Sequence, residues 1–287
     1  MPHPALDRLK VLPQYLVPQH LLSRAIGLLA ESHWPPIKNG LIDFFLKRYG
    51  IDMSIAEQED PHAFACFNDF FTRALKPGVR PIAEQGIACP ADGAISQLGP
   101  IRDDQIFQAK GHYYSLSQLL GGDESMAAQF RNGHFATVYL SPKDYHRVHM
   151  PYGGTLKKMI HVPGKLFSVN TLTAQQVPGL FARNERVVCL FETDMGPMVV
   201  ILVGAMIVAS IETVWEGLVT PHKPTIKHYD YQQREEIRLP KGAEMGRFKL
   251  GSTAIVLFAE AKVEWDQALS EGLGVRMGEA MGTIQQP

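Results

Sequence analysis

From about residue 82 onward, the chain consists of short apolar runs separated by glycine, proline and aspartate, and this pattern constrains the fold most. Runs of about four to eight apolar residues between turn formers are typical of strands. The run 197–212 is long enough for two strands, which we expect to be hinged near Gly204. Strands are expected at 94–98, 135–140, 186–192, 197–212 and 253–260. This part of the chain is therefore predicted to be β-rich.

The first part of the chain has a helical periodicity instead. Apolar residues recur with helical spacing over 15–34 and again over 37–49, and Pro35-Pro36 between them should end the first helix. A short helix is expected at 67–71, where Phe67, Phe70 and Phe71 share one face. The expected fold class is α+β, with an N-terminal helical portion over 1–66 and a β-rich body over 67–287.

The apolar faces of the two N-terminal helices can be interpreted in two ways, which are compatible with each other. Their apolar faces can pack on the body, or they can lie in a membrane interface with Trp34 as an anchor. Residues 1–50 hold six lysines and arginines against three acidic residues, a balance of +3 that suits an anionic surface. The apolar residues of these faces are Leu21, Leu22, Ile26, Leu29, Phe44 and Phe45.

Composition excludes several function classes. The net charge of -1 gives no support to nucleic-acid binding. The three cysteines are far apart and form no C-x-x-C pair, which indicates a reducing compartment and no disulfide framework. The first residues show no apolar signal-peptide core, and the longest apolar run, 198–211, is too short to span a bilayer. We expect a protein that can lie on a membrane without crossing it.

Three polar clusters interrupt the β-rich part. Asp92 lies in the turn 90–93, His146 and His149 lie in the polar loop 141–151, and Ser252 follows Gly251 directly before a strand. Each has an ordinary structural reading, since aspartate and Gly-Ser pairs form turns and histidines satisfy backbone groups. A His-x-x-His metal pair would need a third ligand, and none is near in the sequence, so we expect no metal site.

Asp92, His149 and Ser252 together are the residue types that activate a nucleophile, in which a carboxylate orients a base that takes the serine proton. Their order in the chain excludes nothing, because such triads occur in unrelated orders. There is no G-x-S-x-G motif, and Ser252 enters a strand rather than a helix. A serine hydrolase acting on a lipid or a peptide remains an alternative. A serine after a glycine can also attack the preceding carbonyl and cut its own chain.

Several long motifs then identify a family. These stretches resemble the bacterial phosphatidylserine decarboxylases of the pyruvoyl type, in the order in which the family carries them, from about Phe67 to Gly282. The N-terminal helices suit the family's layout but carry no specific motif. The matching stretches are Pro90-Ala91-Asp92-Gly93, Asp144 to Pro151, Ser168-Val169-Asn170, Val177 to Val187 and Leu250-Gly251-Ser252-Thr253.

This resemblance implies a self-processing enzyme. In the precursor, His149 would act as the base on Ser252 and Asp92 would hold the imidazole of His149. Ser252 would attack the carbonyl of Gly251, and cleavage would leave a covalent pyruvoyl group at position 252, the cofactor that forms a Schiff base with the substrate amine. His146 would handle a proton during decarboxylation. The products of cleavage would be a β chain, 1–251, and an α chain of 36 residues, 252–287.

The resemblance also implies partners and a location. The substrate would be phosphatidylserine in the bilayer and the product phosphatidylethanolamine, and the α and β chains would stay associated. A homodimer is left open, and no nucleic acid is expected. The enzyme would be peripheral, on the cytoplasmic face of the bacterial cell membrane. Besides the hydrolase, a pyruvoyl decarboxylase of a soluble amino acid and a non-catalytic binding module remain as alternatives.

Overall fold

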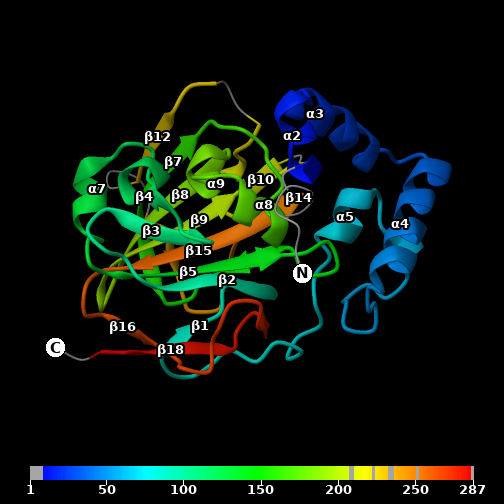
Figure 1. Cartoon of the computed structure of the whole chain (residues 1–287). Coiled ribbons are helices and arrows are strands. Elements are labelled where there is room, and N and C mark those ends of the chain that lie inside the picture. The colour runs from blue at the N-terminus through cyan, green and yellow to red at the C-terminus, as the bar shows by residue number, and fades with distance from the viewer. Residues whose placement is uncertain (1–8, 207–209, 222–223, 232–235, 250–251, 286–287) are drawn as a thin grey trace.

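The computed structural model describes residues 9–206, 210–221, 224–231, 236–249 and 252–285. Figure 1 shows a group of N-terminal helices, in blue and cyan, on one side of a larger body built mainly of strands. The expected α+β class, with a helical N-terminal portion and a β-rich body, is confirmed. The boundary between 66 and 67 stays a prediction.

Two prolines begin the second long helix and do not end the first, contrary to the expectation from the sequence. The first long helix stops at Ala30, and Pro35 and Pro36 occupy the first positions of the next, where a missing N–H costs nothing. That helix ends at Tyr49 and is capped by Gly50, whose φ of 61° is in the left-handed region that glycine adopts readily. The helices of this part are α2 (Pro13–Leu16), α3 (Gln19–Ala30), α4 (Pro35–Tyr49), the 3-10 helix η1 (Pro61–Ala63) and α5 (Phe67–Phe71).

The helical portion has a small core of its own. The ring of Phe45 on α4 lies 4.7 Å from that of Phe67 and 6.1 Å from that of Phe71, both on α5. Ile26 packs against the same cluster. Phe45 and Ile26 therefore take part in this core, as expected if the helices pack on the body, and α5 lies against Phe45. Other apolar side chains of α2, α3, α4 and their links remain exposed, namely Leu16, Leu21, Leu28, Leu29, Trp34 and Phe44.

The body is organised around one antiparallel sheet of nine strands. Their order is β12-β7-β8-β9-β15-β5-β2-β17, and β13 also pairs with β7. The strand β15 lies in its middle, paired with β5 on one side and β9 on the other. The bounds are β2 (Gly93–Pro100), β5 (His134–Leu140), β7 (Gly154–Val162), β8 (Arg186–Thr193), β9 (Gly196–Val203), β12 (Lys227–Asp230), β13 (Arg238–Leu239), β15 (Ser252–Phe258) and β17 (Gly274–Val275).

Smaller elements surround this sheet. A four-stranded sheet has the order β11-β10-β14-β6, a three-stranded sheet the order β1-β18-β16, and β3 and β4 form a hairpin. These strands are β1 (Ile87–Ala88), β3 (Gln105–Ala109), β4 (His112–Ser115), β6 (Arg147–His149), β10 (Ser210–Thr213), β11 (Gly217–Leu218), β14 (Glu244–Lys249), β16 (Val263–Trp265) and β18 (Ala280–Ile284). Four short helices complete the body, namely α6 (Leu116–Leu119), α7 (Glu124–Ala128), α8 (Thr171–Gln176) and α9 (Leu180–Arg183).

The strands expected from the sequence are confirmed, including the division of 197–212 into β9 and β10. The central strand β15 is buried on both faces, because its side chains alternate between two apolar cores. Ala254, Val256 and Phe258 belong to one core, and Ile255 and Leu257 belong to the other. A strand in this position is held by neighbours on all sides, which fixes the place of its first residue, Ser252.

Candidate active site

Ser252 is the first residue of β15 and is fully buried. Its backbone lies opposite Leu140, the last residue of β5, so the loop that follows β5 begins beside it. Its Oγ has no hydrogen-bond partner within the described residues, and neither has the hydroxyl of Thr253. A buried hydroxyl without a partner is costly, and such groups are often kept for a chemical role. Gly251, the other residue of the expected cleavage site, lies outside the described residues.

The turn that carries Asp92 lies close to the end of β5. Ala94 pairs with Tyr139, and a Cβ on Gly93 would stand only 2.2 Å from the carbonyl oxygen of Tyr139. A side chain at position 93 would therefore push the turn away from β5. Glycine keeps Asp92 next to the strand that neighbours Ser252.

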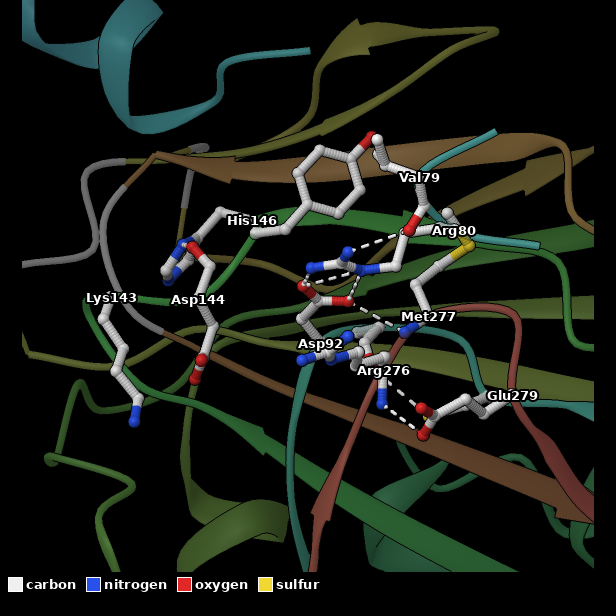
Figure 2. Close-up of polar contacts among 12 residues, drawn as sticks. Val79, Arg80, Asp92, Lys143, Asp144, His146, Arg276, Met277 and Glu279 are labelled. Carbon is white, nitrogen blue, oxygen red and sulfur yellow. Dashed lines mark hydrogen bonds and ion pairs between the residues drawn. The ribbon is translucent and has the colours of Figure 1, made fainter. Parts of the chain in front are cut away.

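The Asp92 carboxylate is bound to Arg80 (Figure 2). Arg80 donates from Nε to Oδ1 at 2.9 Å and from Nη2 to Oδ2 at 2.6 Å, and both side chains are about nine-tenths buried. The backbone N–H of Met277 also donates to Oδ1, at 2.8 Å. This is the bidentate arrangement that binds a carboxylate most strongly. It holds Asp92 between the segment before β1 and the segment after β17.

His149 ends β6, and its backbone N–H donates to the carbonyl of Pro90, which brings it close to the Asp92 turn. Its Nδ1 donates to the carbonyl of Gly242 at 2.8 Å, which leaves Nε2 as the acceptor for the hydroxyl of Tyr145 at 3.0 Å. Burial lowers the pKa of His149. Both ring nitrogens are thus engaged, and neither hydrogen bond goes to Asp92.

His146 is fully buried, with its ring 3.9 Å from that of Phe71 on α5. Its Nδ1 donates to the carbonyl of Asp144 at 2.8 Å, and Nε2 has no partner in the described part of the chain. Burial lowers the pKa of His146 to about 3, so the ring is neutral at ordinary pH. A neutral ring with a free Nε2 can take up or return one proton.

These residues are brought together only in part. Backbone pairing joins all three polar clusters, since β5 borders β15, His149 bonds to Pro90, and the His146 carbonyl accepts from Phe248 on β14. The side chains of Asp92 and His149 do not form the expected hydrogen bond, because Arg80 occupies the first and Gly242 and Tyr145 the second. Their roles in self-cleavage stay predictions.

A pocket of about 690 Å³ opens beside this region. Asp92, Tyr139, Ser141 and Tyr145 contribute to its wall, so it borders both the Asp92 turn and the loop next to Ser252. Sequence reasoning missed Arg80, Tyr145 and the buried Arg73, which also line it. Arginine and tyrosine are hydrogen-bond donors that a buried carboxylate or imidazole needs, so their residue types were one indication of a role here. The neighbouring sequence does not show which partner each of them contacts.

Two absences apply to the described residues. They contain no cluster of three or more histidine, cysteine, aspartate or glutamate side chains that could hold a metal ion. None of their helices has the length and apolar character needed to cross a bilayer.

Comparison with known proteins gives consistent matches over nearly the whole chain. The family model "Phosphatidylserine decarboxylase" matches residues 67–283, and a second model, "PSD", matches residues 9–50. A protein of Bordetella avium is 61% identical over 277 residues, covering 96% of this chain and 94% of its own length. One of Ectopseudomonas mendocina is 62% identical over 97% of this chain and 99% of its own, and one of Pseudomonas aeruginosa is 61% identical over 98% of both. All three bear the name phosphatidylserine decarboxylase proenzyme.

Proposed function

The chain belongs to the phosphatidylserine decarboxylase family and is a carboxy-lyase, and we propose that it makes phosphatidylethanolamine from phosphatidylserine with a pyruvoyl group generated from its own Ser252. The observation that carries the proposal is the buried Ser252 hydroxyl without a partner in the described residues. The name proenzyme, borne by the relatives, supports a chain that is cut during maturation. Strand β15 also suits such a group, since β5 and β9 would hold a new chain end at residue 252.

Maturation begins with attack of Ser252 Oγ on the carbonyl carbon of residue 251. The peptide C–N bond breaks as the ester C–O bond forms, and the serine proton ends on the nitrogen. Elimination then removes the α-proton of residue 252 and breaks its Cβ–O bond, which releases residue 251 as a carboxylate. The remaining dehydroalanine tautomerises, and water replaces its nitrogen, which leaves as ammonia. The result is a pyruvoyl group at the start of the chain 252–287.

His149 is the proposed base for the first step, through the lone pair of Nε2. The Tyr145 hydroxyl donates to that atom, so the serine proton reaches Nε2 either after this hydrogen bond opens or through the tyrosine, which would pass on its own proton. Burial lowers the pKa of His149, and the charge of Asp92 acts by opposing part of that shift. His149→Ala and Asp92→Asn should both accumulate uncut chain on a denaturing gel. Maturation at the wild-type rate in either variant would remove that residue from the scheme.

In decarboxylation, the pyruvoyl group supplies a carbonyl that binds the substrate amine and withdraws the electrons left when CO₂ departs. His146 is the proposed proton carrier for the α-carbon. Its Nδ1–H is fixed on the Asp144 carbonyl, so the proton is handled at Nε2. Because burial lowers the pKa of His146 to about 3, a protonated ring would return its proton readily.

The exposed apolar side chains of the N-terminal helices are the proposed membrane contact. They form a set on α2, α3, α4 and the links between them, on the side of the molecule that Figure 1 shows apart from the main sheet. Phosphatidylserine keeps its acyl chains in the bilayer, so the enzyme would have to reach the headgroup at the interface, where such apolar side chains can insert. The proposed location is the cytoplasmic face of the bacterial cell membrane.

The experiment compares wild type with Ser252→Ala by intact mass and by conversion of phosphatidylserine in detergent micelles. Wild type should give two chains, 1–251 and 252–287, and should release CO₂. The second chain should have a lower mass than its sequence predicts, because its terminal serine has become a pyruvoyl group. Ser252→Ala should give one chain and no conversion. An uncut wild type that decarboxylates, or two fragments from Ser252→Ala, would refute the proposal. An uncut wild type that frees fatty acids would favour the hydrolase.

A further inference from the structure

The pocket beside Ser252 is lined by equal numbers of cationic and anionic side chains. The cations are Arg73, Arg80, Lys143 and Arg276, and the anions are Asp52, Asp92, Asp144 and Glu279. Tyr139 and Ser141, at the end of β5, line it as well. Leu140, the residue between these two, pairs with Ser252. A ligand that reaches residue 252 from this pocket would therefore meet these charges first.

The carboxylates of this pocket already have donors. Asp92 is bound by Arg80, and Asp144 accepts from both the N–H and the hydroxyl of Ser141 at 2.7 Å. Glu279 accepts the N–H of Arg276 at 2.8 Å, which Figure 2 shows below the Asp92 pair. Asp52 accepts both the N–H and the hydroxyl of Ser54. The anions are thus engaged by their own turns and by Arg80.

Arg73 is the exception among the buried charges of the pocket. It directly follows Thr72, the last residue of the α5 turn, and is 3% exposed. Its Nε and Nη1 have no hydrogen-bond partner among the described residues, and its Nη2 makes one long bond, 3.4 Å, to the carbonyl of Lys143. The guanidinium carbon lies 5.7 Å from the centre of the Phe70 ring. A buried cation with two free N–H edges is unfavourable unless a ligand completes it.

The position of Arg73 relates it to the reacting residues. Its charge is near enough to lower the pKa of His146, whose carbonyl accepts from Phe248 on the strand that leads toward Ser252. It also lies within electrostatic reach of Asp92 and Asp144. An anion on Arg73 would therefore lie in the pocket that borders the Asp92 turn and the loop next to Ser252.

We propose that Arg73 binds the phosphodiester group of the phosphatidylserine headgroup and thereby sets the distance of the serine amine from residue 252. This inference rests on the proposed function. A guanidinium presents its N–H groups as a planar fork that fits two phosphate oxygens. The carboxylate of the substrate is the less suitable partner, because it leaves as neutral CO₂. An arginine on that carboxylate would stabilise the ground state more than the transition state, whereas the phosphodiester keeps its charge throughout.

Binding is tested first in uncut chains, which do not depend on maturation. Ser252→Ala should bind soluble glycerophosphoethanolamine, measured by changes in its NMR spectrum, and should not bind ethanolamine at the same concentrations. Adding Arg73→Gln should weaken this binding on the order of 10- to 100-fold, as expected for a lost hydrogen bond to a charged group. Adding Arg131→Gln instead should change nothing, because Arg131 is exposed and its ion pair is with Glu124.

Kinetics of the mature enzyme give the second test. Arg73→Gln should raise KM for phosphatidylserine by a similar factor with kcat within about threefold of wild type, and Arg73→Lys, which keeps the charge but not the fork, should lie between them. Equal binding in the two uncut chains, or a loss of kcat with unchanged KM, would overturn the assignment. If Arg73 were needed for binding inorganic phosphate but not for binding glycerophosphoethanolamine, Arg73 would be assigned to a free anion, and the proposal would be overturned too. A wild type that neither cuts itself nor decarboxylates would refute the proposed function instead, and the binding test would still decide Arg73.

Discussion

The buried ring of His146 should make the protein less stable in mild acid, because the unfolded chain takes up a proton there and the folded chain does not. The ring is fully buried, and burial lowers its pKa to about 3, against about 6.5 in an unfolded chain. Between these two values the unfolded chain binds the proton and the folded chain does not. Stability should therefore be complete above pH 6.5 and should fall as pH drops toward 3, by about 1.4 kcal/mol per unit. From pH 8 to pH 5 the loss from this ring alone is about 2 kcal/mol.

The assay is urea unfolding of Ser252→Ala, whose single chain avoids the complication of two fragments, at several pH values between 8 and 5. The comparison is the same chain with His146→Leu. Removing the ring should lower the free energy of unfolding at high pH, because packing against Phe71 and the bond to Asp144 are lost. The gap between the two chains should then shrink by about 2 kcal/mol at pH 5. His149 contributes to the slope of both chains and cancels in the difference.

Exposed His228 provides the matched control, and His228→Asn should follow the pH slope of the parent chain. A gap between the parent and His146→Leu that is the same at pH 8 and pH 5 would refute the reasoning. It would mean that the folded chain takes up the proton at residue 146 as easily as the unfolded chain, and that the ring is not kept neutral by burial.

Three further predictions concern the Asp92 pair, the second histidine and the membrane. Arg80→Leu should lower the free energy of unfolding by about 3–5 kcal/mol in urea titrations, because it leaves a buried carboxylate, whereas changing Asp92 to Leu as well should recover most of the loss. His146→Ala should still cut itself on a gel yet decarboxylate about 10²- to 10⁴-fold more slowly; an uncut chain would contradict this division. Serine at the three exposed positions Leu21, Leu28 and Trp34 should abolish co-sedimentation with anionic vesicles at any salt concentration, without affecting cleavage. Undiminished sedimentation would exclude these positions as the membrane contact.

The sequence predicts elements better than contacts. The strand β15 was predictable, because an apolar run after a Gly-Ser turn is a local pattern. The packing of Phe45 against α5 was not, since the periodicity of α4 marks an apolar side chain without showing what it contacts. Pro35-Pro36 likewise mark a break between helices, and only the following residues decide that they begin the next one.

The same limit applies to the candidate site. Asp92, His146 and His149 are noticeable because polar residues interrupt apolar runs. The partners of these side chains come from distant segments, as Arg80 and Met277 do for Asp92, and Gly242 does for His149. A hydrogen-bond network of this kind depends on which turns meet in space. The Arg73 side chain could be read from the sequence only as a cation at the end of a short helix.

The central place of β15 has a consequence for the timing of maturation during synthesis. The strand that carries Ser252 fills the middle of the nine-stranded sheet, and Met277, which helps to hold Asp92, lies still later in the chain. A ribosome-bound chain that ends before β15 has an open gap between β5 and β9. One that ends after β15 but before Met277 has the strand but lacks one of the groups that hold Asp92. In the proposed scheme, such a chain cannot cut itself, because domains assemble only from residues already released. The fold would thus act as a check on completeness, allowing the irreversible step only after the sheet has closed.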